Sequence, residues 1–156
     1  MALYNFIWWF VFFIIAIVAQ SILSGIDFLL VGVIIALQER RIGQLIWVIL
    51  VAILLQEGMG TLPFGSALLW YVSAIVVFYG GRALFEAENF VFIFLVSAIL
   101  GVLHYLFIFS VASLHDLAIN STRLLWECAI QVMIIPPLWR LAYFLRRNVK
   151  VSEDRA

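Results

Sequence analysis

Few side chains in this sequence of 156 residues could do chemistry, and three of them, His104, Glu127 and Gln131, fall inside long apolar runs. An imidazole at membrane depth could relay a proton, ligate a metal or bond a neighbouring helix, and ionisable groups are costly there. Glu127 and Gln131 are four residues apart, so they share one face of a helix. Their carboxylate and amide could bond another helix or line a polar cavity, although Glu127 is also close enough to the end of its run to reach water. We therefore treat the three residues as a candidate polar cavity.

The sequence carries no pattern typical of catalysis or of a bound metal. His104 has no second His, Cys or carboxylate at ligand spacing, so packing against a neighbouring helix is its simpler interpretation. Nucleophilic catalysis needs a Ser or Cys with a His in reach and an oxyanion donor. Ser73, Ser97 and Ser110 are instead single hydroxyls inside apolar runs, where each can bond a carbonyl one turn back. We expect a protein that is not an enzyme and uses no cofactor or metal.

The composition indicates a membrane protein. Hydrophobic residues make up 67% of the chain and charged residues 12%, against roughly 45–50% and 25% in soluble domains. The formal net charge is zero, which gives no support for a nucleic acid partner. We expect one transmembrane domain over residues 1–147 and a short polar cytoplasmic tail over residues 148–156.

Six apolar runs predict an all-α membrane protein, a compact bundle of about six transmembrane helices. The runs cover residues 3–23, 26–37, 42–55, 67–79, 90–114 and 124–145. The second and third are shorter than the roughly 20 residues that cross a bilayer, so they are either short spans or a partly re-entrant hairpin. Asp27 begins the second run and is expected to cap its helix. Pro136 and Pro137 should bend or break the sixth helix, because each removes a backbone donor.

The positions of the basic residues predict the orientation in the membrane. If the N-terminus lies inside, every Lys and Arg except Arg123 falls on the cytoplasmic side, as the excess of basic residues in cytoplasmic loops requires. Both termini should then be cytoplasmic. The residues expected to anchor this side are Arg40, Arg41, Arg82, Arg146, Arg147 and Lys150.

The densest motif is a turn between the third and fourth runs, where an acidic residue precedes a glycine-rich stretch and then small residues. At this motif the chain resembles the rod shape-determining protein MreD family. In this turn, which also includes Gly58, Glu57 takes the acidic position, at which that family has Asp. Gly60 and Pro63 match the turn itself, and Phe64-Gly65 with Ala67-Leu68 match its end. Looser matches are Arg82, the Pro136-Pro137 pair and the basic end of the last run. The turn is accordingly a candidate partner contact or a structural turn.

The resemblance implies a function, a location and partners. It implies a scaffold in the bacterial cytoplasmic (inner) membrane, belonging to the elongation machinery that sets cell shape and directs peptidoglycan synthesis. Its expected neighbours are membrane lipid and MreC and, through MreC, MreB filaments, the RodA polymerase and the elongation transpeptidase.

A rival interpretation is a small-molecule-capturing membrane subunit, similar to the substrate-binding component of energy-coupling factor vitamin transporters. Such a subunit needs polar groups around an outward-facing pocket, for which Glu127, Gln131 and the loop over residues 56–66 are candidates. The Ala-x-x-x-Ala pair usual in the first span of those proteins is missing, because Ala16 and Ala19 are three apart. A proton-coupled carrier, the third class, would have only His104 and Glu127 as buried ionisable groups.

Overall fold

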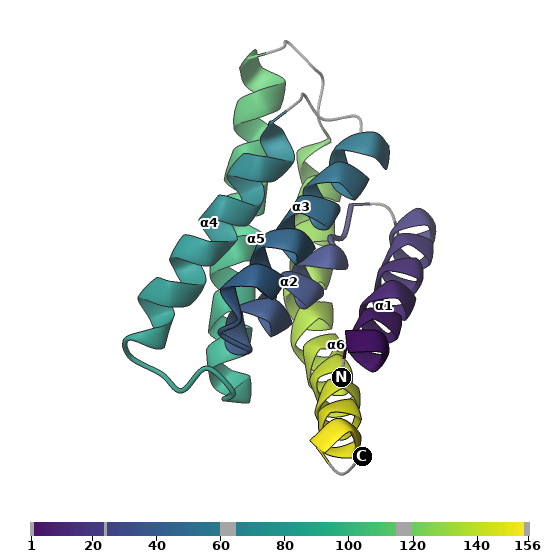
Figure 1. Cartoon of the computed structure of the whole chain (residues 1–156). Coiled ribbons are helices and arrows are strands. Elements are labelled where there is room, and N and C mark those ends of the chain that lie inside the picture. The colour runs from purple at the N-terminus through teal and green to yellow at the C-terminus, as the bar shows by residue number, and fades with distance from the viewer. Residues whose placement is uncertain (1, 24, 60–64, 115–119, 155–156) are drawn as a thin grey trace.

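All the regular secondary structure in the described part of the chain is helical, as the sequence predicts (Figure 1). The computed structural model describes residues 2–23, 25–59, 65–114 and 120–154. Its helices are α1 (Ala2–Ile22), α2 (Leu29–Gln38), α3 (Ile42–Met59), α4 (Ser66–Arg82), α5 (Phe90–Leu114) and α6 (Ser121–Asp154). Within these ranges, α1, α5 and α6 contain stretches long and apolar enough to cross a membrane, while α2, α3 and α4 are shorter apolar helices.

The helix bounds follow the apolar runs closely, with one correction in α6. The fifth helix has the predicted bounds, and α4 includes the Gly80-Gly81 pair. Of the predicted bend or break at Pro136 and Pro137, the break is wrong, because α6 continues through both residues. Proline in a membrane helix is tolerated where neighbouring groups and small local adjustments satisfy the freed carbonyls. The same helix also continues past residue 148, where the polar tail was expected to begin.

The short helix α2 lies at the centre of the bundle. Every residue from Leu29 to Leu37 is buried, and α2 packs against α1, α3, α4 and α6. A helix that is apolar on all sides is stable only when other elements surround it. Its 10 residues extend about 15 Å at 1.5 Å per residue, which is half of a hydrocarbon core of about 30 Å. The N-terminus of α2 is therefore buried at mid-bundle depth.

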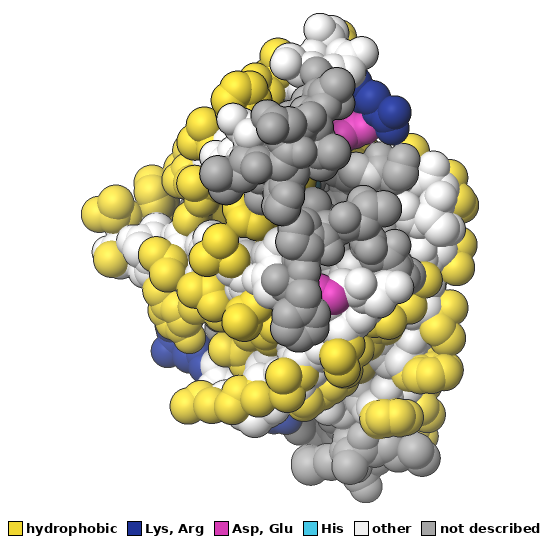
Figure 2. Space-filling model, turned by 90° about the horizontal axis from the view of Figure 1, so that it is seen from above, with side chains coloured by type: hydrophobic (Ala, Val, Ile, Leu, Met, Phe, Trp, Pro, Cys, Tyr) yellow, Lys and Arg dark blue, Asp and Glu magenta, His cyan; other side chains and the backbone are white. Residues whose placement is uncertain are grey.

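The remaining helices turn one face towards α2 and the other outwards. Large buried side chains such as Trp9, Tyr71, Phe78 and Trp139 fill the interior. Hydrophobic side chains also cover most of the perimeter that is visible in Figure 2. Close helix contacts use single glycines rather than a GxxxG pair, for example where a Cβ at Gly101 would lie 2.4 Å from a methyl group of Val132. An apolar interior with an apolar perimeter is what a lipid-embedded bundle requires.

Four helix ends and turns meet at one end of the bundle. Contacts of Arg146 join the first turns of α1, the α2–α3 turn and the end of α6, and Gln38 contacts the α4–α5 turn. We call this the basic end, because it includes the exposed residues Arg40, Arg41 and Arg147. The N-terminal part of α1 and the C-terminal part of α6 lie near each other there (Figure 1).

Candidate functional site

A buried ion pair is the centre of a polar cluster at the basic end. The Arg146 Nε atom lies 2.8 Å from Oε1 of Glu39, and the two side chains are only 3% and 4% exposed. The Arg146 Nη2 atom also donates to Glu39 Oε2 at 3.3 Å, to Gln44 Oε1 at 3.4 Å and to Asn5 Oδ1. Gln44 in turn donates to Glu39. Burying two charges is tolerated when such additional hydrogen bonds satisfy them.

Two tryptophans of α1 complete this cluster. The Arg146 guanidinium carbon lies 4.9 Å from the ring centroid of Trp8 and 5.5 Å from that of Trp9. Both distances are within the range of a cation–π interaction. The cluster therefore ties α1 and α6 to the α2–α3 turn. Sequence analysis assigned Arg146 to the membrane surface and missed its pairing with Glu39, since nothing in the local sequence relates residues so far apart.

Gln38, at the end of α2, connects two further elements. Its Oε1 accepts a hydrogen bond from Trp139 Nε1 at 2.8 Å, and its Nε2 donates to the carbonyl of Ala87 at 2.5 Å. Beside it lies a cleft of about 670 Å³, which we call the basic-end cleft. Its lining residues are Gln38, Arg40, Arg82, Ala83, Leu84, Phe85, Glu86, Ala87 and Glu88. The cleft thus presents two cations and two carboxylates at the end of α4 and on the two neighbouring turns, next to the part-buried hydrogen bonds of Gln38.

Asp27 forms a second polar cluster at mid-bundle depth. Its Oδ1 accepts hydrogen bonds from the Leu30 N–H at 3.2 Å and the Tyr71 hydroxyl at 3.3 Å, and its Oδ2 accepts one from Trp70 Nε1 at 2.8 Å. The bond to Leu30 confirms the predicted cap of α2. Buried N-termini of half-helices can bind anionic ligands. Here the Asp27 side-chain carboxylate occupies the N-terminus of α2, where such a ligand would bind.

The candidate polar-cavity residues are not connected to one another by a hydrogen bond within the described ranges. The His104 ring packs edge-on against Trp70 with centroids 5.2 Å apart, which agrees with a packing role. Glu127 forms an ion pair with Arg123 at 2.8 Å, and its side chain is 24% exposed. Gln131 is fully buried, and neither atom of its amide has a hydrogen-bond partner among the described residues.

The glycine-rich turn is held by its acidic residue. Glu57 Oε1 accepts a hydrogen bond from the Gly65 N–H at 2.8 Å, which joins the end of α3 to the start of α4. Gly65 has a left-handed φ of 88°, which favours glycine. Gly58 is exposed, while Gly60, Pro63 and Phe64 lie outside the described residues. The bond supports a structural role for Glu57, although its side chain is one methylene longer than the Asp expected at this position.

The other predicted polar residues have local roles. Ser73, Ser97 and Ser110 each donate to a carbonyl one turn back, as predicted. Arg82 lies half-buried in the basic-end cleft. The side chain of Lys150 lies outside the described residues.

Comparisons of the chain with protein-family models, curated proteins and solved structures gave no match.

Proposed function

We propose that the chain is a non-enzymatic scaffold in the bacterial inner membrane, with six spans and its basic end in the cytoplasm. In this proposal it couples cytoskeletal filaments to peptidoglycan synthesis during cell elongation. Two kinds of observation support it. The turn from Glu57 to Gly65 resembles the MreD family, and the basic-end cleft offers a polar surface to a partner.

The basic-end cleft is the main structural support for this proposal. The buried charged groups Asp27, Glu39 and Arg146 are engaged with other parts of the chain, so they are not available for substrate. The cleft instead combines exposed Arg40 and Glu86 on turns that are fixed to the bundle. A preformed surface with charges of both signs suits a polypeptide partner, because complementary charges set orientation and specificity.

The proposed partners follow from the resemblance. MreC would be the direct neighbour in the membrane, and MreB, RodA and the elongation transpeptidase would be reached through it. The basic-end cleft would face proteins on the cytoplasmic side. The Glu57 turn, at the other end of α3, would contact partner segments on the opposite side.

In vivo photo-crosslinking tests this proposal. A photoreactive amino acid at Leu84, an exposed residue of the cleft, should capture cell-elongation or cytoskeletal proteins. The same amino acid at Val102, on the exposed face of α5, is the matched control and should capture no cytoskeletal protein. Capture of an ATPase pair at Leu84, or equal capture of cytoskeletal proteins at both positions, would contradict the scaffold proposal.

Gln131 favours a second candidate, the small-molecule-capturing subunit. A buried amide without a protein partner is expensive, so it calls for a water molecule or a ligand group. Native mass spectrometry of the chain purified from its own membranes would decide this point. A bound small molecule that is lost in Gln131→Leu would support capture, whereas identical spectra for both proteins would support a structural role for Gln131.

A further inference from the structure

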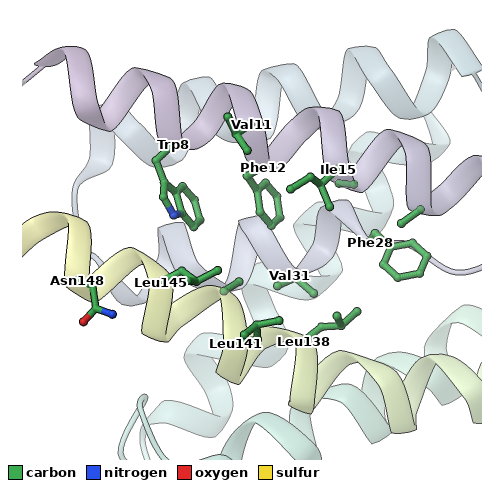
Figure 3. A pocket seen from close by; sticks show the side chains of 13 residues that line it. Trp8, Val11, Phe12, Ile15, Phe28, Val31, Leu138, Leu141, Leu145 and Asn148 are labelled. Carbon is green, nitrogen blue, oxygen red and sulfur yellow. The ribbon is translucent and has the colours of Figure 1, made fainter.

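An apolar groove runs between α1 and α6, with α2 as its floor (Figure 3). Its volume is about 500 Å³. Val11, Phe12 and Ile15 line it from α1, Val31 from α2, and Leu141 and Leu145 from α6. Both walls belong to candidate membrane spans, so the α1–α6 groove opens to the bilayer.

Hydrogen bonds near both ends and ring contacts of Trp9 and Phe13 with Trp47 of α3 hold α1 on the bundle, and they leave the side of α1 that faces α6 open as a groove. At the basic end Asn5 accepts a hydrogen bond from Arg146, and further along α1 Gln20 donates to Gln56 at 2.6 Å. Between them the contact with α2 is close at one glycine, where a Cβ at Gly32 would lie 2.5 Å from the ring of Phe12. The space between α1 and α6 is left for another apolar group.

The length of the groove matches one leaflet of a bilayer. On α1 it extends from Trp8 to Ala19, and on α6 from Leu138 to Asn148. At 1.5 Å per residue the two walls are about 15–17 Å long, which is roughly half of a hydrocarbon core of about 30 Å. A transmembrane helix of a partner would need about 20 residues and the full thickness. An acyl chain from one leaflet fits this length, and a spanning helix does not.

The mouth of the groove offers hydrogen bonds to a lipid headgroup. Trp8 and Asn148 lie at the same end, which is the basic end, and the indole nitrogen of Trp8 faces the groove (Figure 3). Neither the Trp8 N–H nor the Asn148 amide forms a hydrogen bond with other described residues. Phosphate and ester oxygens are acceptors, and tryptophan prefers the level of the headgroups. Donors at the mouth and apolar walls beyond it match the two parts of a phospholipid.

We infer that the α1–α6 groove binds one acyl chain of a glycerophospholipid from the leaflet at the basic end. The Trp8 and Asn148 donors then hold its phosphate or ester oxygens. This inference requires insertion in a membrane and does not depend on the scaffold role.

The test uses the full chain, purified and reconstituted into vesicles of phosphatidylethanolamine and phosphatidylglycerol that contain a phospholipid with a photoreactive acyl chain. Peptide mapping should find most adducts on the groove faces of α1 and α6. Adducts spread evenly over all the exposed apolar faces, including that of α5, would overturn the inference. This measurement needs no variant and no partner protein, so its failure leaves the scaffold proposal untouched.

Matched variants add a second measurement. Ala142→Trp fills the groove, because Ala142 lines it, whereas Val102→Trp adds the same ring to the exposed face of α5. Native mass spectrometry should show about one retained phospholipid in the unchanged chain and in Val102→Trp. Retention should fall at least five-fold in Ala142→Trp. Equal retention in all three proteins would contradict the inference, as would the absence of retained lipid from the unchanged chain.

Discussion

Glu39 and Arg146 form a buried ion pair that links the α2–α3 turn to the distal part of α6, with 2.8 Å between Oε1 and Nε. The Arg146 guanidinium also lies against the rings of Trp8 and Trp9 of α1, so the contacts of this one side chain hold three parts of the chain together. Its removal should therefore affect the whole basic end of the bundle.

We expect single substitutions in this pair to be strongly destabilising. Arg146→Met leaves the Glu39 carboxylate buried without its cation, which costs roughly 3–5 kcal/mol. The double variant with Glu39→Leu should recover much of that loss, since no unpaired charge remains. Unfolding in mixed micelles at increasing denaturant measures both effects. Arg147→Gln, at an exposed position of the same helix, is the control. If it lowered the free energy of unfolding as much as Arg146→Met, the stabilising role of the buried pair would be contradicted.

Asp27→Leu should destabilise the centre of the bundle. The substitution leaves Trp70 Nε1 and the Leu30 N–H without the acceptor that they have now, and each unsatisfied buried donor costs about 1–3 kcal/mol. Thermal unfolding should show a clear drop in the midpoint. Ser73→Ala removes only a local hydrogen bond to the Leu69 carbonyl and should change the midpoint little. If Asp27→Leu were as stable as Ser73→Ala, the assigned role of Asp27 would be wrong.

Two glycine-to-alanine substitutions should differ in their effect on the free energy of unfolding. Gly101→Ala places a Cβ 2.4 Å from Val132 Cγ2 and should separate α5 from α6, whereas a Cβ at Gly43 meets nothing within 4 Å. Gly43→Ala should be neutral or stabilising by up to about 1 kcal/mol, because alanine favours the helix. The same unfolding assay compares them. Equal stability of the two variants would show that α5 and α6 do not approach as closely as described.

Cysteine labelling tests the orientation of the bundle. Cys128 is the single cysteine of the chain, so Cys128→Ala gives a background for new cysteines. With a membrane-impermeant thiol reagent on intact cells, Asn120→Cys should react, while Arg41→Cys should react only after the membrane is opened. The reverse pattern would place the basic end outside and would remove the basis for cytoplasmic partners. Labelling of both positions in intact cells would contradict the predicted crossing.

The sequence by itself determined the helical elements. An apolar run long enough for a helix leaves few alternatives in a membrane, because backbone groups must be satisfied within the segment. This is why the bounds of α5 could be predicted correctly. The cap at Asp27 could be predicted because a cap depends only on residues adjacent to the start of the helix. The continuation of α6 through Pro136 was missed, since the rule for proline was applied without the packing that stabilises the helix.

Only the tertiary structure decided which buried polar groups meet. The pairing of Glu39 with Arg146 and the approach of Trp70 to Asp27 join residues from separate helices. Helix packing sets these contacts, and an apolar periodicity without a strong polar face does not specify which helices become neighbours. The same reason explains the central position of α2 and the groove between α1 and α6. The local sequence sets where a helix begins and ends. The packing of all the helices together sets which side chains touch and where a groove remains.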